Sequence, residues 1–183
     1  MVIRGFPLTS RSEVWGGSLL GVAHGLEGTG VPWDQVLSLL ERSGIHQPEP
    51  EAWYPLDSYL AFLSDVELVH GREALRAMGR AIPDTSRFPP DLDHMERALR
   101  LLDVAYQVNH RGGPIGRYHL RRFKPGEAEM CCENPYPCDL DLGILERLVE
   151  RFGTGGSEAG VTHRPGIECR REGATACVFD LRW

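Results

Sequence analysis

The hydrophobic pattern of this chain changes its period once, at the glycine-rich segment RGGPIG of residues 111–116. Before this segment, apolar residues recur every three or four positions, which is the spacing of amphipathic helices. After it they alternate with polar residues, as in strands that cover one face of a sheet. A chain divided in this way packs helices against a sheet instead of alternating strands with helices. We therefore expect an α+β fold, with N-terminal helices packed on a small antiparallel sheet.

The sequence predicts five helices in the first half, and the last of them is the most clearly marked. Asp93 and Glu96 have the spacing of a capping box, and an apolar stripe follows them. The expected helical ranges are 14–26, 32–44, 56–69, 72–82 and 93–110.

The second half is expected to have the order strand–strand–helix–strand–strand. The expected ranges are 116–123, 127–132, 141–153, 160–169 and 176–183, with 141–153 as the helix. No repeat or linker indicates a second domain. We expect one sensory-type domain over residues 1–183, with a mainly helical part at 1–112 and a sheet part at 113–183.

Composition narrows the classes of function. The 183 residues carry a formal net charge of -6, which argues against direct binding to nucleic acid. There is no apolar run of 18 residues, so no membrane association is expected. The N-terminal segment lacks the apolar core of a signal peptide, and we expect the protein in the cytoplasm.

The chain has five cysteines, and a reducing cytoplasm does not favour a disulfide framework. Cys169 and Cys177 flank the turn of the expected final hairpin, where two thiolates would supply half of a tetrahedral zinc site. An upstream cysteine and a strand histidine would complete it, with Cys132 next in line. The expected metal ligands are Cys138, His163, Cys169 and Cys177. The alternative, burial of these cysteines as small apolar residues, stays open.

Two local expectations concern exposure. Cys131 and Cys132 are adjacent on an expected strand, so one should face the core and the other outward. Acidic neighbours of the outward thiol would raise its pKa and make it a poor nucleophile. The charged segment RREGAT of residues 170–175 is expected to be solvated surface.

The segments NPYPCDLDLGILERLVERFG and VTHRPGIECRREGATACVFDL, at residues 134–153 and 161–181, resemble the end of the 4-vinyl-reductase-type ligand-binding domain. That family closes with a cysteine, a glycine turn, a second cysteine and an aromatic strand. It is related to the sensory domains of phenol-responsive transcription activators, to haem-NO-binding domains and to Golgi transport particle subunits. The resemblance covers about residues 113–183 and implies a ligand-binding sensory fold.

The resemblance also bears on cofactors. In zinc-bearing members the two hairpin cysteines join an upstream cysteine and a glutamate, and the matching cysteines here are Cys169, Cys177 and Cys138. The position of the glutamate is occupied by Gly166, so the fourth ligand departs from the family pattern. The haem-NO-binding branch carries a Tyr-x-Ser-x-Arg signature that this chain lacks, and no histidine is marked as an axial ligand. Zinc is therefore the expected cofactor and haem is not.

Two clusters could line a ligand site, an aromatic one at 51–63 and a polar one at 106–119. An arginine there could bind a carboxylate or phosphate of the ligand. The expected ligand-binding residues are Trp53, Tyr59, Tyr106, His110, Arg117 and Tyr118. The alternatives are an ordinary aromatic core and an ordinary helix end with its turn.

No catalytic motif stands out, so a non-catalytic function is expected. We expect a sensory module that binds a small apolar or aromatic molecule between helices and sheet and signals to a regulatory protein partner. A homodimer is expected by analogy with related domains. The alternatives are a zinc-stapled adaptor without ligand and a cysteine-dependent enzyme. A cavity of roughly 300 Å³ or more would favour the sensor over the adaptor.

Overall fold

The computed structural model of the protein describes residues 11–85, 92–154, 159–164 and 169–183. The expected α+β fold is confirmed: the helices come first, and the longer strands lie in the C-terminal half. The helices are α1 (Gly16–Glu27), α2 (Trp33–Arg42), α3 (Leu56–His70), α4 (Arg72–Thr85), α5 (Met95–Val108) and α6 (Cys138–Phe152).

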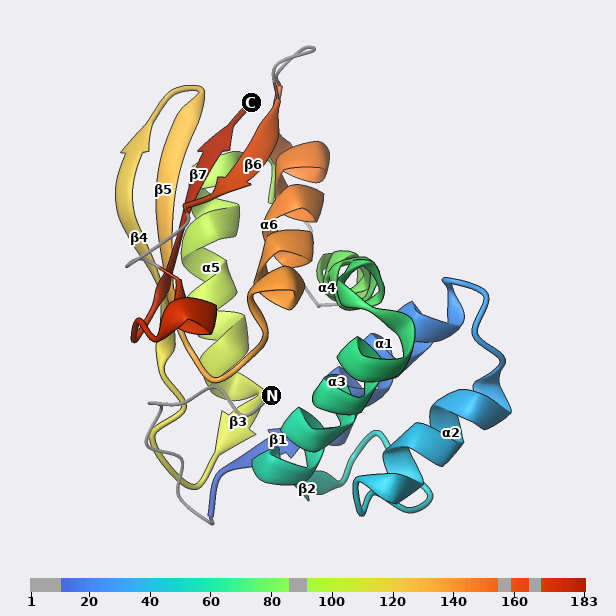
Figure 1. Ribbon diagram of the computed structural model, residues 1–183. Coiled ribbons are helices and arrows are strands. Elements are labelled where there is room, and N and C mark those ends of the chain that lie inside the picture. The colour runs from blue at the N-terminus through green and yellow to red at the C-terminus, as the bar shows by residue number, and fades with distance from the viewer. Residues whose placement is uncertain (1–10, 86–91, 155–158, 165–168) are drawn as a thin grey trace.

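The C-terminal half forms a four-stranded antiparallel sheet in the order β4-β5-β7-β6. Its strands are β4 (Arg117–Lys124), β5 (Glu127–Glu133), β6 (Gly160–His163) and β7 (Cys177–Arg182). The helices α5 and α6 pack against this sheet, and α4 lies between α6 and the group formed by α1, α2 and α3 (Figure 1). The fully buried Met130 and Phe179 face each other across β5 and β7 in the core below these helices. Part of the expected strand 160–169 lies outside the described residues.

A second sheet was not predicted from the sequence. It has the order β2-β1-β3, with β1 (Glu13–Trp15), β2 (Trp53–Pro55) and β3 (His110–Arg111). Strands of two or three residues are too short to show a period, which is why the pattern missed them. The pairing of Val14 with His110 ends the expected helix 93–110 early and places the histidine beside β1. This small sheet therefore brings the start of the described chain to the C-terminal end of α5.

The helices α4 and α6 join the helical part to the sheet part at very short range. A Cβ atom added at Gly79 would lie 2.1 Å from the carbonyl oxygen of Leu140, and one added at Gly143 would lie 2.0 Å from that of Arg76. Only glycine allows two helix backbones to approach this closely. Ion pairs flank the contact: Arg72–Asp139, Arg76–Glu146 and Arg80–Glu150.

One local expectation was wrong. Cys131 does not face outward to solvent, because it is 5% exposed beside Val178 of β7, which is also buried. Burial, more than its acidic neighbours, raises the pKa of the Cys131 thiol. Long charged side chains lie on this face of the sheet, where Arg121 and Arg164 pair with Glu129, and an alternating pattern cannot reveal this.

Among the described residues, no helix combines the length and the apolar character needed to cross a bilayer.

Candidate ligand cavity and metal cluster

A cavity of about 580 Å³ lies between the helical part and the sheet part. Its size falls in the range of cavities that hold small molecules and cofactors. Most of its lining is apolar or aromatic, and comes from β1, α1, α3, the end of α4, α5, β3, β4, the loop before α6 and α6. The apolar lining includes Val14, Val22, Ile82, Leu102, Leu140 and Ile144.

The polar centre of the cavity is a pair formed by His110 and Tyr136. The His110 Nδ1 atom lies 2.7 Å from the backbone carbonyl oxygen of Tyr106, and its Nε2 atom lies 2.5 Å from the Tyr136 hydroxyl. A carbonyl oxygen can only accept, so Nδ1 carries the proton and Nε2 accepts a hydrogen bond from the tyrosine. The lone pair of Nε2 therefore points at the Tyr136 hydroxyl in the cavity wall.

Burial sets the ionisation of this pair. It lowers the pKa of His110 to about 4, against an opposing effect of the hydrogen bond to Tyr106. It also raises the pKa of Tyr136 well above its ordinary value. Both groups are therefore neutral near pH 7, and the imidazole is available as a hydrogen-bond acceptor or a metal ligand.

Acid is expected to destabilise the ligand-free protein through His110. Its pKa is about 4 in the folded state and 6.5 as the ordinary value for the unfolded chain. Between these values the unfolded state binds a proton that the folded state does not, so the free energy of unfolding falls as the pH falls. The loss reaches about 3 kcal/mol near pH 4 and is complete only below that pH. Denaturant titrations of the wild type and of His110→Asn across this pH range measure the loss. An equal fall in the free energy of unfolding in both proteins would contradict the role of His110.

The structure separates the six expected ligand-binding residues into two groups. Four of them line the cavity: Tyr59, Tyr106, His110 and Tyr118. Trp53 is absent from the described lining. It lies under Arg111, whose guanidinium carbon is 4.3 Å from the centre of the Trp53 ring. Arg117 is also absent from that lining, because it is exposed and pairs with Glu133 at 3.1 Å.

Tyr136 was missed by the sequence analysis, which assigned the cysteine of NPYPC to the metal site and gave its tyrosine no role. It is 4% exposed and its ring packs edge-on against Tyr59 and Tyr106. An aromatic residue between two prolines, in a loop joining strand to helix, was a signal for a restricted backbone that carries an inward-facing ring.

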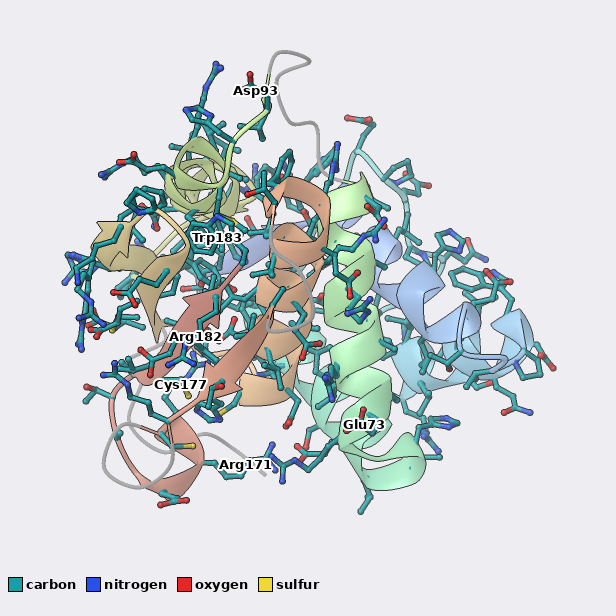
Figure 2. All side chains as sticks on the ribbon, turned by 90° about the horizontal axis from the view of Figure 1, so that it is seen from above. Glu73, Asp93, Arg171, Cys177, Arg182 and Trp183 are labelled. Carbon is teal, nitrogen blue, oxygen red and sulfur yellow. The ribbon has the colours of Figure 1, made fainter. Side chains whose placement is uncertain are left out.

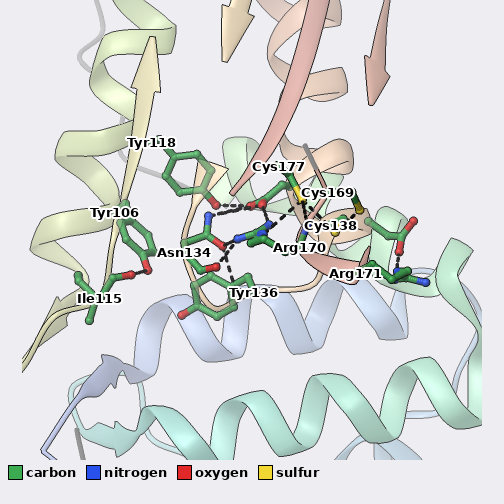
Figure 3. Close-up of polar contacts among 12 residues, drawn as sticks. Tyr106, Ile115, Tyr118, Asn134, Tyr136, Cys138, Cys169, Arg170, Arg171 and Cys177 are labelled. Atoms are coloured by element: carbon green, nitrogen blue, oxygen red, sulfur yellow. Dashed lines mark hydrogen bonds and ion pairs between the residues drawn. The ribbon is translucent and has the colours of Figure 1, made fainter. Parts of the chain in front are cut away.

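A second group of side chains, the cysteine–histidine cluster, consists of Cys138, His163, Cys169 and Cys177. Their ligand atoms all lie within 4.8 Å of one another. Cys138 begins α6, His163 ends β6, Cys169 precedes the short 3-10 helix η2 (Arg170–Glu172) and Cys177 begins β7. Figure 3 shows the three sulfur atoms converging at this corner.

The donor set fits a zinc ion. The Sγ atom of Cys138 lies 3.1 Å from that of Cys177 and 3.8 Å from that of Cys169. Ligands on a tetrahedral zinc with bonds near 2.3 Å are roughly 3.8 Å apart. The Nε2 atom of His163 is buried and has no hydrogen-bond partner among the described residues, which is costly unless something else binds it.

The Cys138 thiol is prepared for ionisation. The hydrogen bond from Cys177 lowers the pKa of Cys138, and the nearby Arg170 adds to the effect, while burial opposes it. The same hydrogen bond raises the pKa of Cys177. A thiolate is the form that binds a metal, so this geometry favours metal binding at Cys138.

The expectation that RREGAT is solvated surface was wrong for Arg170, whose side chain is 1% exposed. It forms an ion pair with Asp141, which is fully buried on α6. No sequence pattern indicates this pair, because the partners are 29 residues apart and Arg170 lies in a charged turn.

No protein-family model matches this chain, and no curated protein sequence matches it. Several solved structures match it in fold. An H-NOX protein from S. oneidensis in the Fe(II)NO ligation state superposes with a TM-score of 0.68 at 13% identity, over 91% of this chain and 97% of that chain. A point mutant of T. tengcongensis H-NOX gives 0.62 at 15% identity, over 91% and 96%. Unliganded Fe(II) H-NOX from K. algicida gives 0.62 at 10% identity, over 92% and 95%.

The chain therefore has the fold of H-NOX domains. The comparisons show a fold shared with H-NOX domains, and they do not support the 4-vinyl-reductase name.

The expectation that haem is unlikely is overturned. One structure that shares the fold concerns haem redox potential and porphyrin distortion, and others carry Fe(II) in their names. The expectation relied on a missing Tyr-x-Ser-x-Arg motif and on the lack of a marked axial histidine. The structure places the neutral His110 in the cavity, where the sequence predicted a ligand-binding residue but marked no axial ligand.

Proposed function

We propose that this chain is a sensory domain that binds one small molecule in the cavity around His110 and Tyr136, and signals its presence to a partner. The observation that carries the proposal is the cavity itself. Its volume of about 580 Å³ exceeds the roughly 300 Å³ expected of a small-molecule site, which favours the sensor over an adaptor with a filled core. The fold shared with an oxygen-binding H-NOX domain supports the same reading.

Haem is the first candidate ligand. The Nδ1–H group of His110 donates to a backbone carbonyl, which is the arrangement that orients a metal-binding histidine. Its Nε2 atom would hold the iron after Tyr136 moves aside, and bound iron would supply the coordination position for a gas. The described lining has hydroxyl and amide donors, such as Ser18, Thr85 and Asn109, and no arginine or lysine. The carboxylates of a haem would then be neutralised mainly by solvent.

A small aromatic molecule with one hydrogen-bonding group is the second candidate. A specific observation favours it: Nε2 of His110 and the Tyr136 hydroxyl already form a neutral polar pair within an apolar wall. A hydroxyl on the ligand could insert between them and satisfy both.

Zinc at the cysteine–histidine cluster completes the proposal as a structural ion. It would tie the end of β6 and the start of β7 to the first turn of α6. A cysteine-dependent enzyme is disfavoured, because three of the five thiols belong to the cluster and burial raises the pKa of Cys131 and Cys132. As part of the proposal the domain acts in the cytoplasm as a homodimer with a regulatory protein partner, by analogy with related sensors.

A hemin titration followed by absorbance tests the proposed ligand site. We expect one hemin per chain, with affinity reduced at least about tenfold in His110→Ala, because the axial donor is gone. The matched control is His119→Ala, which removes an exposed histidine of β4 and should bind like the wild type.

Two other outcomes decide between the candidates. If hemin does not bind but simple phenols raise the thermal stability of the wild type and not of His110→Ala, the aromatic ligand replaces haem. If neither class binds, or both bind equally to His110→Ala, the proposed site is wrong.

A further inference from the structure

The buried ion pair of Arg170 and Asp141 lies between the cysteine–histidine cluster and the cavity. Arginine is almost never fully buried, and apolar residues of similar volume often stabilise a protein as well as such a pair does. The two side chains are 1% and 0% exposed. A pair of this cost, placed directly after the cluster residue Cys169, calls for a role beyond packing.

On one side, Arg170 contacts the cluster. Its Nε–H group and its backbone N–H group both donate to the Sγ atom of Cys177, each at 3.3 Å. These two donors fix the guanidinium relative to a proposed metal ligand. The position of the Cys177 sulfur therefore determines where the Arg170 side chain can lie.

On the other side, the same guanidinium holds the cavity wall (Figure 3). Its Nη2 atom donates to Asp141, whose second oxygen accepts from the Tyr118 hydroxyl at 2.6 Å. Its Nη1 atom donates to the backbone and side-chain oxygens of Asn134. The Asn134 side-chain oxygen also accepts from the backbone N–H of Tyr136, at 3.0 Å. Tyr118 and Tyr136 both line the cavity.

We propose that Arg170 is a positioning residue that couples the cluster to the cavity, so that metal binding and ligand binding strengthen each other. The inference rests on the proposed function, because it needs both sites. The Sγ atoms of Cys138 and Cys177 lie 3.1 Å apart, whereas two ligands on a tetrahedral zinc lie roughly 3.8 Å apart. Metal binding would therefore shift the Cys177 sulfur, and Arg170, which donates two hydrogen bonds to that sulfur, would shift with it. Buried hydrogen-bond networks transmit such changes strongly, and the coupling must be reciprocal.

The neighbouring Arg171 provides a matched control. Its side chain, labelled in Figure 2, leaves the same short helix in another direction and contacts α3 and the first turn of α6. Its guanidinium pairs with Glu67 at 3.1 Å and with Asp139 at 2.6 Å, and it is absent from the described cavity lining. Replacing it changes charge next to the cluster without touching the route to the tyrosines.

The test measures hemin affinity with zinc bound and after zinc is removed with a chelator, and zinc affinity with and without hemin. We expect both affinities to fall at least about fivefold when the other ligand is absent, by the same factor. This ratio of affinities, with and without the other ligand, should approach one in the double variant Arg170→Met/Asp141→Asn. It should stay at the wild-type value in Arg171→Met. Arg170→Lys, which keeps the charge and loses the planar fork, should retain only part of the coupling.

The double variant avoids leaving a charge buried alone, and the asparagine still accepts from Tyr118. Hydrogen exchange at the Tyr118 amide, which donates to Asp103 at 2.8 Å, gives a readout that needs no ligand. Zinc should slow this exchange in the wild type and in Arg171→Met, and not in the double variant.

The outcomes separate the two proposals. If zinc and hemin both bind the wild type with affinities that are independent of each other, the coupling is wrong and the proposed function stands. If zinc does not bind, the cluster is not a metal site and the coupling is wrong, while the hemin and phenol titrations still decide the proposed ligand site. If hemin does not bind, the exchange experiment alone decides: unchanged Tyr118 exchange on adding zinc overturns the coupling.

Discussion

Replacing Cys169 with alanine is expected to abolish zinc binding and to remove most of the stability that zinc confers. The residue supplies one of three sulfurs in a four-donor cluster, and structural zinc sites are four-coordinate. With free zinc at a thousandfold excess over its dissociation constant, the folded wild type gains about 4 kcal/mol. For a chain of this length that corresponds to a rise in melting temperature of about 8–16 °C. Thermal unfolding with zinc and with chelator measures the gain.

The control for this experiment is Cys131→Ala. Cys131 is as buried as Cys169 and lies outside the cluster, so it shares the cost of losing a buried sulfur. Cys131→Ala should bind about one zinc per chain and keep the full zinc-dependent shift. A shift of equal size in Cys169→Ala, or no shift in the wild type, would rule out the metal site.

The second large effect is expected at the contact between α4 and α6. In Gly79→Ala the new methyl group would lie 2.1 Å from the carbonyl oxygen of Leu140, which belongs to backbone and cannot rotate away. The two helices must separate, and their flanking ion pairs must stretch with them. We expect a loss of about 3 kcal/mol or more, at the upper end of overpacking effects, against a gain of about 1 kcal/mol in helix propensity. Urea unfolding followed by circular dichroism measures it.

Gly28→Ala is the matched control, because this glycine also has helical backbone angles and its added methyl group would make only ordinary contacts. It should change stability by less than about 1 kcal/mol. The double variant Gly79→Ala/Gly143→Ala should cost less than the sum of the single changes, since either one already forces the helices apart. Full additivity, or a Gly79→Ala protein as stable as the control, would mean that the helices are not in close contact.

The sequence was sufficient to predict the main helices and strands and to name the four residues of the cysteine–histidine cluster. Periodicity placed α5 and β5 within a few residues, and the spacing of Cys169 and Cys177 around a turn anticipated a shared corner. These features depend on local patterns and short loops. The cluster needed only one longer step, the return of β6 and β7 to the start of α6.

The cavity could be foreseen only in part, for physical reasons. Tyr106, His110 and Tyr118 come from one segment, so their proximity was readable. Val14 and Tyr136 reach the same space from elements far away in the chain, through a sheet too short to show a period and a proline-flanked loop. Long-range pairs such as Arg170 with Asp141 leave no periodic trace at all.

The central claim is that a folded chain holds a small molecule beside His110 and Tyr136. Native mass spectrometry of protein purified without denaturation, with identification of any released compound, tests it most directly. The comparison is Ala105→Trp, which fills the cavity from α5, with Arg100→Phe on the solvent-facing side of the same helix as control. We predict one small molecule per chain in the wild type and the control, and none in Ala105→Trp. A wild type that carries no molecule and takes up neither hemin nor phenols, or an adduct that Ala105→Trp retains, would contradict the account.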